Sequence, residues 1–300
     1  MIFLKGIMER NPKRNVKKIL VIGATGNIGS SLLEQDNNKT LIGTSRSLGN
    51  GPIISLNPYN KEDIKLIIRE HNIDSIVLLS ATSKVDACYK NINLSSLSNI
   101  ELPKIVSKAS DELNKQIIFM STEYIYNGEI ENEKNESVKN ICPKNYYSLQ
   151  KYAAETLVLE TNKRSLILRL PKVYNFEYPG NFVYNFINKV KDGSKLHKVA
   201  ADQIFSPLST YDLYKIIVLS ANKDLKGIYN CGGIESKSRY EFILDIINSL
   251  KLNCMIEKDS LLNISGDSDL PLNVAMDSSK LHTELSYWPN SLKECIKRIL

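Results

Sequence analysis

Short apolar runs alternate with helical patterns through the first half of the chain. The runs at 17–23, 40–46, 75–82, 116–122 and 165–171 predict buried β-strands. Between these runs, apolar residues recur at the three- and four-residue spacing of an amphipathic helix. Strands that alternate with helices are typical of βαβ units, which build a parallel sheet. The pattern therefore predicts a doubly wound α/β fold.

The helices of this half are predicted from the same pattern. They occupy 27–35, 60–72, 97–114 and a stretch that begins near Tyr146. In the second helix, Ile64, Ile67 and Ile68 share one face, so we expect them to be buried. In the third helix, Pro103 predicts an irregularity, because proline has no backbone N–H to donate.

After residue 171 the pattern becomes less regular. Helices are predicted near 181–191, 210–221, 238–250 and 290–300, with a strand-like run at 227–233. This mixture predicts a second, smaller lobe of mixed α/β structure.

The polar stretch 129–140 joins the predicted strand that ends at Thr122 to the helix near Tyr146. Loops at the carboxyl ends of parallel strands line the site in such folds. A solvated loop and a loop that partly covers a substrate are equally compatible with its composition.

Composition excludes several classes of protein. A net charge of +6, with 42% hydrophobic and 24% charged residues, is ordinary for a soluble protein. The basic cluster at 11–18 is interpreted as part of a solvated extension rather than as a site for an anionic partner. Aromatic residues do not interleave with basic ones, so no nucleic-acid partner is expected. No apolar run approaches the ~20 residues that span a bilayer, so no membrane partner is expected.

Cysteine and histidine usage indicates the compartment and argues against a metal site. The five cysteines are widely spaced and form no CxxC motif: Cys88, Cys142, Cys231, Cys254 and Cys295. This usage predicts reduced thiols and a cytoplasmic location. The three histidines are isolated and lack metal-ligand spacing, so no metal is expected.

A glycine motif follows the first predicted strand and opens the first predicted helix. Gly23, Gly26 and Gly29 form a GxxGxxG pattern in "VIGATGNIG". Glycines allow a tight turn and let the backbone approach a pyrophosphate at the helix N-terminus. We therefore predict a Rossmann-type dinucleotide site. The residues expected to hold the cofactor are Gly23, Thr25, Gly26, Asn27, Ile28, Gly29, Ser45, Arg46, Ser80, Ala81, Thr82, Asn99, Tyr147 and Lys151.

The end of the second predicted strand favours NADP(H) over NAD(H). A carboxylate at this point usually binds the ribose 2′-hydroxyl of NAD, whereas an arginine accommodates the 2′-phosphate of NADP. Arg46 stands here, with Thr44, Ser45 and Ser47 as hydroxyl donors.

Tyr147 and Lys151 lie four residues apart and so share one helix face, while Tyr146 points away from it. The spacing alone fits either an acid–base pair or an ordinary helix. Beside a nicotinamide, the Lys151 ammonium would lower the pKa of Tyr147, which could then pass a proton to a carbonyl oxygen. Ser121 and Thr122 end a parallel strand, where a hydroxyl that polarises the same oxygen belongs.

Six motifs, in register from about residue 18 to the C-terminus, resemble the dTDP-4-dehydrorhamnose reductase family of the extended short-chain dehydrogenase/reductase superfamily. They are "STEYIYNG", "PKNYYSLQKYAAE", "ILRLPKVYN", "ADQIFSPLSTYDL", "GIYNCGG" with "SRYEFILDII", and "LPLNVAMDSSKL". The resemblance implies an NADP(H)-dependent reductase of a nucleotide-linked 4-keto-6-deoxy sugar in deoxysugar biosynthesis. It is also compatible with a homodimer.

The resemblance assigns roles position by position. Tyr147 matches the catalytic tyrosine, Lys151 the lysine that tunes it and holds the nicotinamide ribose, and Thr122 the hydroxyl of the triad. Asn99 matches the asparagine of the neighbouring helix, and Asp86 lies with Val85 in a segment that lines the site. The residues implied to contact the substrate are Val85, Thr122, Glu123, Tyr124, Tyr147 and Gln203.

Several positions depart from the family pattern, mostly in the parts that read the sugar. Ser148 and Phe205 replace glycines, and Leu170, Pro171 and Lys172 replace threonine, serine and tryptophan; Leu270 replaces an arginine, Asn57 an aspartate, and Tyr89 an acidic residue linked to a magnesium-bridged dimer. The sugar-reading part of the site is therefore expected to differ from that of the family, and metal dependence is not expected.

Alternatives to simple reduction remain open. Nucleotide-sugar 4,6-dehydratases carry an Asp-Glu pair after the threonine, but this chain has Glu123 and Tyr124, which favours reduction. A relative of this fold can serve as a cofactor-binding regulatory subunit, as in methionine adenosyltransferase. An epimerase/reductase would need a second acid–base pair, for which Cys88 and His197 are the candidates.

These patterns together predict the domain organisation. An extension at 1–16 precedes an NADP-binding Rossmann domain at 17–170, and a substrate-binding lobe follows at 171–300. Segments near 205–232 are expected to return from the lobe to the first domain.

Overall fold

A computed structural model describes residues 16–47, 53–126, 128, 134–137, 141–266 and 269–300. The predicted N-terminal extension lies almost wholly outside these ranges. Within them, no helix is both long and apolar enough to cross a membrane.

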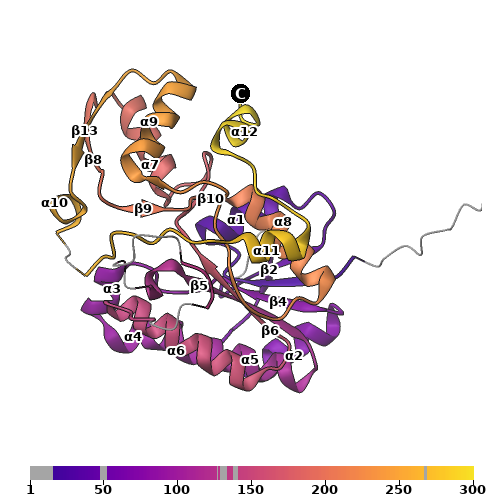
Figure 1. Ribbon diagram of the computed structural model, residues 1–300. Helices are drawn as coiled ribbons and strands as arrows, with labels where there is room; N and C mark the ends of the chain where they lie inside the picture. The colour runs from indigo at the N-terminus through magenta and orange to yellow at the C-terminus, as the bar shows by residue number, and fades with distance from the viewer. Residues whose placement is uncertain (1–15, 48–52, 127, 129–133, 138–140, 267–268) are drawn as a thin grey trace, which may run out of the picture.

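A seven-stranded parallel sheet forms the centre of the molecule (Figure 1). Its strands are β1 (Ile19–Ile22), β2 (Leu41–Ser45), β3 (Ile53–Ser55), β4 (Ser75–Leu78), β5 (Gln116–Thr122), β6 (Ser165–Leu170) and β11 (Gly227–Asn230). Their order is β11-β6-β5-β4-β1-β2-β3, which places β1 and β4 side by side at the middle. The fold class predicted from the sequence is confirmed. The short edge strand β3 is an addition that the apolar pattern did not predict.

Helices cover both faces of this sheet (Figure 1). One face packs against α2 (Lys61–Glu70), α5 (Leu102–Glu112) and α6 (Tyr146–Thr161). The other packs against α1 (Asn27–Gln35), α8 (Thr210–Lys223) and α11 (Ser279–Leu285). Ile64, Ile67 and Ile68 of α2 are all buried against the sheet, as their spacing predicts.

The irregularity expected at Pro103 is a π-helical turn, Leu97–Glu101, that precedes α5. Two short helices, α3 (Val85–Lys90) and α4 (Ile92–Ser96), lead into it. Pro103 has no N–H to offer the carbonyl of Asn99, so the regular i→i−4 ladder cannot continue through this point. The N–H of Leu102 instead donates to the carbonyl of Leu97, and the wide turn contains the buried Asn99.

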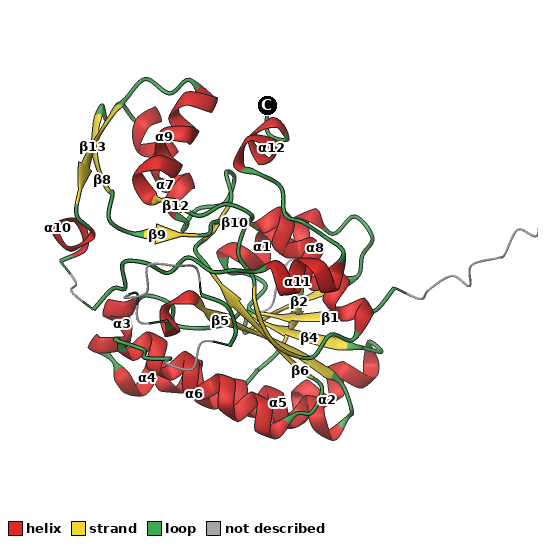
Figure 2. Ribbon diagram, viewed as in Figure 1, coloured by secondary structure: helices red, strands yellow, loops and turns green. Residues whose placement is uncertain are grey.

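The second lobe lies above the carboxyl end of the sheet (Figure 2). It contains α7 (Phe182–Lys191), α9 (Arg239–Leu250), α10 (Leu261–Ser265) and α12 (Leu292–Lys297), with short strand pairs of β7 (Val173–Tyr174), β8 (Leu196–Ala200), β9 (Ile204–Phe205), β10 (Leu208–Ser209), β12 (Lys237–Ser238) and β13 (Met255–Asp259). Phe205 and Phe242 lie in its apolar core with their ring centres 5.6 Å apart.

Part of the later chain belongs to the sheet rather than to this lobe. β11 pairs with β6 from Gly227 opposite Leu166 to Asn230 opposite Arg169. Residues of α8 share an apolar core with β1 and β5. These contacts place segments near 205–232 against the sheet, where α11 also packs, and the division into domains remains a proposal.

Candidate active site

The glycine-rich loop between β1 and α1 has the geometry of a phosphate cradle. Gly23 has φ +97°, and a Cβ atom there would lie 2.7 Å from the backbone nitrogen of Ser80. A Cβ atom at Gly29 would lie 2.7 Å from the Cα atom of Ala24, so neither position admits a side chain. Gly26 caps α1 without a side-chain hydrogen bond, which leaves the first N–H groups of the helix available for an anion. These residues fit a dinucleotide pyrophosphate.

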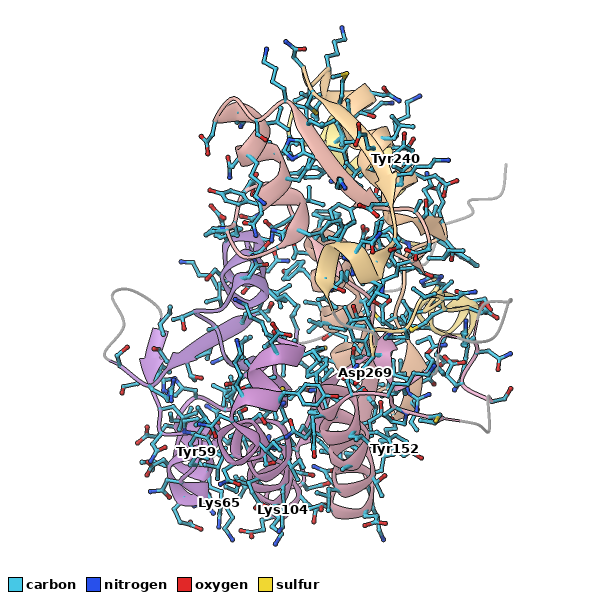
Figure 3. The ribbon with its side chains drawn as sticks, turned by 90° about the vertical axis from the view of Figure 1, so that its left-hand side faces the viewer. Tyr59, Lys65, Lys104, Tyr152, Tyr240 and Asp269 are labelled. Atoms are coloured by element: carbon cyan, nitrogen blue, oxygen red, sulfur yellow. The ribbon has the colours of Figure 1, made fainter. Side chains whose placement is uncertain are left out.

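A cavity of about 860 Å³ runs from this loop along the ends of β2 and β4. Arg46, Ser45 and Ser47 line its far end together with Tyr59, which Figure 3 places in the sheet domain. Eight of the predicted cofactor residues line this cavity: Gly23, Thr25, Gly26, Ser45, Arg46, Ser80, Ala81 and Thr82. The cavity is large enough for the adenosine part of a dinucleotide.

A second cavity, of about 400 Å³, continues from the first and contains the predicted catalytic residues. Gly23, Gly26, Leu79 and Ala81 line both cavities. Predicted residues lining the second cavity are Asn27, Ile28, Gly29, Thr122, Glu123, Tyr124, Tyr147 and Lys151. The structure thus brings the tyrosine, lysine and threonine together beside the glycine-rich loop.

Tyr147 lies in the first turn of α6, where the helix start is fixed by a capping box. The side chain of Asn145 accepts from the N–H of Ser148, and the Ser148 hydroxyl accepts from the N–H of Asn145. Burial raises the pKa of Tyr147 well above its ordinary value, and a hydrogen bond with Thr122 offsets only part of this rise. A phenol in this setting stays protonated at neutral pH, as a proton donor must.

The pKa of Tyr147 is raised overall rather than lowered, contrary to the expectation from the sequence, and Lys151 does not reverse this rise. The amine is itself buried, and burial lowers the pKa of Lys151 to about 7, although Glu155 raises it in part. The Glu155 carboxylate forms a buried ion pair with Arg169 at 2.8 Å. The positive charge of Arg169 therefore offsets part of the effect of Glu155 on the pKa of Lys151. Only part of the Lys151 population is therefore charged at neutral pH.

Glu123 is a buried carboxyl group in the same cavity. It is 2% exposed, and its Oε2 atom has no hydrogen-bond partner among the described residues. Burial raises the pKa of Glu123 to about 8, although the charges of Lys172 and Arg239 lower it. Most Glu123 side chains are therefore neutral at pH 7 and able to donate a hydrogen bond.

Three predicted site residues line neither cavity. Asn99 is buried and holds Thr82 in place: its Oδ1 atom accepts from the Thr82 N–H at 2.9 Å, and its Nδ2 atom donates to the Thr82 carbonyl at 3.0 Å. Gln203 is buried and donates to the carbonyl of Pro271 at 2.8 Å. Val85 packs against the core of the second lobe. Asn99 thus holds Thr82, which lines the first cavity. That Asn99, Gln203 and Val85 contact a ligand directly remains a proposal.

The residues considered for other roles lie away from the chemistry. Tyr146 is 38% exposed and packs edge-on against Tyr89, with ring centres 5.0 Å apart. Cys88 is buried beneath the carbonyl of Thr82, and the His197 ring packs against Phe186. Neither Cys88 nor His197 lines a cavity among the described residues. The epimerase alternative therefore loses its candidate acid–base pair.

The described part of the 129–140 loop, residues 134–137, contributes to neither cavity. Lys134 is buried and pairs with Met276 in an isolated bridge. The Glu136 carboxylate accepts from the N–H of Asn230 on β11. This part packs against the sheet edge, and the rest of the loop lies outside the described residues.

Some cavity residues were not identified from the sequence. The side chain of Asn27 donates to the carbonyls of Tyr178 and Pro179, which ties the glycine-rich loop to the second lobe. Gly180, Asn181 and Phe182 follow this tie and line the second cavity. Lys172 also lines it, close after β6, as Thr122 does at the end of β5. The sequence marked Lys172 only as a departure from the family pattern, and its place beside a parallel strand end is the signal that could have made it a candidate ligand contact.

Asp269 joins the two parts of the molecule close to the site (Figure 3). The Tyr89 hydroxyl donates to the carboxylate of Asp269 at 2.8 Å, and Asn145 donates to its carbonyl at 3.2 Å. Because Asn145 also caps α6, this contact links the start of the Tyr147 helix to the second lobe.

Comparison with known proteins extends these observations to the whole chain. A family model described as the RmlD substrate binding domain matches residues 17–300. The chain belongs to this family. The resemblance seen in the six motifs is thereby confirmed.

The relatives of this RmlD-family chain include a reductase and a subunit of methionine adenosyltransferase. It is 25% identical over 295 residues to a dTDP-4-dehydrorhamnose reductase from Aggregatibacter actinomycetemcomitans, a match that covers 94% of this chain and 98% of that protein. It is 23% identical over 274 residues to methionine adenosyltransferase 2 subunit beta from Xenopus laevis, covering 88% and 81% of the two chains.

The RmlD-family fold is also seen in solved structures. A dTDP-4-dehydrorhamnose reductase from Bacillus anthracis str. Ames, crystallised with NADP, superposes with a TM-score of 0.81. The two chains are 24% identical, and the match covers 94% of this chain and 98% of the other. The similarity shows that the fold is shared.

Proposed function

We propose that the chain is an NADP(H)-dependent reductase of a nucleotide-linked 4-keto-6-deoxy sugar. The observation that carries this proposal is the grouping of Thr122, Tyr147 and Lys151 in one cavity that continues from the glycine-rich loop. The name of the Aggregatibacter relative, dTDP-4-dehydrorhamnose reductase, supports the choice of substrate class.

The chain's own residues would perform the proton transfer. When bound, the nicotinamide would supply a hydride to C4 of the sugar. Tyr147 would donate its phenolic proton to the C4 oxygen, and the Thr122 hydroxyl would hold that oxygen in place. The protonated form of Lys151 would bind the nicotinamide ribose and stabilise the phenolate that Tyr147 becomes.

Arg46 supports NADP(H) as the preferred cofactor. It lines the first cavity beside Ser45 and Ser47, and no acidic residue lines that cavity among the described residues. A guanidinium with neighbouring hydroxyls suits a 2′-phosphate, whereas the ribose diol of NAD is usually bound by a carboxylate.

Glu123 and Tyr124 support reduction rather than dehydration. Both residues line the cavity, but only Glu123 is a carboxylic acid. Elimination of water needs an acid and a base in addition to the tyrosine. Glu123 is the one carboxylic acid among the described residues that line this cavity, and it cannot serve as both the acid and the base.

NADPH oxidation tests this function directly. The assay uses a panel of dTDP-, UDP- and GDP-linked 4-keto-6-deoxy sugars, with the wild-type chain and its Tyr147→Phe variant. We expect turnover with at least one member and a loss of about 10³-fold in Tyr147→Phe, the typical contribution of a general acid. Tight NADPH binding without turnover of any member would contradict the proposal.

A regulatory role is the second candidate, because several relatives are methionine adenosyltransferase 2 beta subunits. In that case the chain would bind NADP(H) without needing turnover. The same assay separates the two functions, because a regulatory subunit would bind the cofactor equally well in wild type and Tyr147→Phe and would reduce no sugar in either form.

A further inference from the structure

An acidic and a basic side chain beside the catalytic cavity each have a buried atom without a hydrogen-bond partner in the described part of the chain. Within the described residues, the buried atoms that lack a hydrogen bond include Oε2 of Glu123 and Nε of Arg239. The two side chains interact electrostatically. An unsatisfied buried polar atom costs about 1–3 kcal/mol, so a ligand that hydrogen-bonds to these atoms would recover that free energy. The hydroxyl of Ser121, which also lines the cavity, is unsatisfied as well.

Lys172 brings a second positive charge to the same place. It lines the cavity, and its Nζ atom lies 5.4 Å from the centre of the Tyr124 ring. Neither Lys172 nor Arg239 forms an ion pair with any described residue. Lys172 reaches the cavity from the segment after β6, and Glu123 from the end of β5. Arg239, at the start of α9, lies outside the cavity lining.

The charges at this end of the cavity do not balance. Burial keeps most Glu123 side chains protonated at neutral pH, so they do not neutralise Lys172 and Arg239. Lys172 therefore places an unneutralised positive charge in the cavity wall, next to a carboxylic acid that can donate a hydrogen bond. An oxyanion can form an ion pair with Lys172 and accept the hydrogen bond from Glu123, whereas a neutral hydroxyl offers Lys172 no opposite charge.

We propose that Lys172 and Glu123 form an anion subsite at the substrate end of the catalytic cavity. Lys172 contacts an oxyanion of the substrate, and Glu123 donates a hydrogen bond from Oε2 to the same ligand. Arg239 lines neither cavity and acts as a positioning residue, because it interacts with Glu123 rather than with the ligand. The oxyanion is either the diphosphate that joins sugar to nucleoside or a carboxylate on the sugar ring. This inference rests on the proposed nucleotide-sugar function.

Calorimetric titration of the full-length chain, saturated with NADP⁺ at pH 7, tests the subsite without turnover. The ligands are inorganic pyrophosphate, and the dTDP and UDP forms of glucose and glucuronate. Lys172→Gln removes the charge. Lys189→Gln removes a matched charge from the exposed face of α7 and serves as the control.

If the diphosphate is the anion, Lys172→Gln weakens pyrophosphate and every nucleotide sugar by about tenfold or more, a loss of ~1.4 kcal/mol. If the anion is a sugar carboxylate, the variant weakens only the glucuronate forms and leaves pyrophosphate and the glucose forms unchanged. Lys189→Gln binds all ligands as the wild type does. Arg239→Gln weakens the same ligands to a smaller degree, and Arg239→Lys restores them.

The subsite is overturned if Lys172→Gln binds every ligand as tightly as the wild type, or if the wild type binds none of them. Failure of the proposed function gives a different result. In that case pyrophosphate binding depends on Lys172, but no nucleotide sugar binds and none is reduced.

Discussion

The Nζ atom of Lys151 lies 3.9 Å from the centre of the Phe119 ring. Phe119 belongs to β5, and the same strand ends in Thr122, the hydrogen-bond partner of Tyr147. β5 thus supplies both the hydroxyl for the phenol and the apolar cover for the amine. Because this cover lowers the pKa of Lys151 to about 7, the charge of the proposed catalytic lysine changes within the ordinary working range.

Activity should therefore fall as the pH rises above about 7. A lowered pKa means that Lys151 carries its charge below pH 7 and loses it above. The ratio kcat/KM for NADPH reports ionisations of the free enzyme, so it should fall by up to about tenfold per pH unit beyond this point. The measurement is a profile of kcat/KM from pH 6 to 9.

Two variants identify the group responsible for that fall. Lys151→Arg keeps its charge throughout the range, so it should be slower but show no fall near pH 7. Glu123→Gln removes the carboxyl whose pKa is about 8 and should keep the fall near pH 7. A fall that persists in Lys151→Arg would assign it to another group.

Glu123→Gln should alter how stability depends on pH. Burial raises the pKa of Glu123 from 4.5 to about 8, so between these values the folded protein holds a proton that the unfolded chain has released. The contribution of Glu123 to the free energy of unfolding is therefore lost as pH rises, by up to about 1.4 kcal/mol per pH unit. The variant cannot ionise and should gain stability relative to wild type from pH 5 to pH 8.

Urea unfolding at pH 5, 6.5 and 8 measures this difference. Glu160→Gln, which removes an exposed carboxyl from α6, is the control and should follow the wild type. A constant difference between Glu123→Gln and wild type across the three pH values would show that the folded Glu123 titrates normally.

Arg46→Ala should change the choice of cofactor. Arg46 is exposed at the end of the first cavity, so its removal should not disturb the fold. Loss of a charge-assisted bond of ~1.5–3 kcal/mol to the 2′-phosphate should weaken NADPH by about 10- to 100-fold. NADH has no 2′-phosphate and should bind both proteins equally. Fluorescence titration with the two cofactors measures this, and equal weakening of both would contradict the role of Arg46.

The sheet was predictable because its central strands are buried on both faces. β1, β4, β5 and β6 read as mostly apolar runs, since helices cover both sides of each strand. The pair β8 and β13 lies at the surface of the second lobe and has many exposed residues, so it lacks this signal. β3 is too short to form a distinct apolar run.

The candidate site was predictable where local sequence determines the geometry. The four-residue step from Tyr147 to Lys151 and the glycine pattern act within single elements, and both place their residues on the cavities. The grouping of Glu123, Lys172 and Arg239 comes from three elements far apart in sequence, so no spacing could reveal it. Burial decides the pKa of Lys151, and sequence spacing carries no measure of burial.

The two adjacent tyrosines allow the most direct test of the central claim. Tyr147 lines the cavity, whereas Tyr146 lies at the surface against Tyr89. Each is changed to phenylalanine, and single-turnover reduction of the best 4-keto-6-deoxy sugar is measured with saturating NADPH. Our account predicts that Tyr147→Phe loses about 10³-fold in rate while binding NADPH normally, and that Tyr146→Phe keeps most of its activity. Equal rates for Tyr147→Phe and wild type would contradict it.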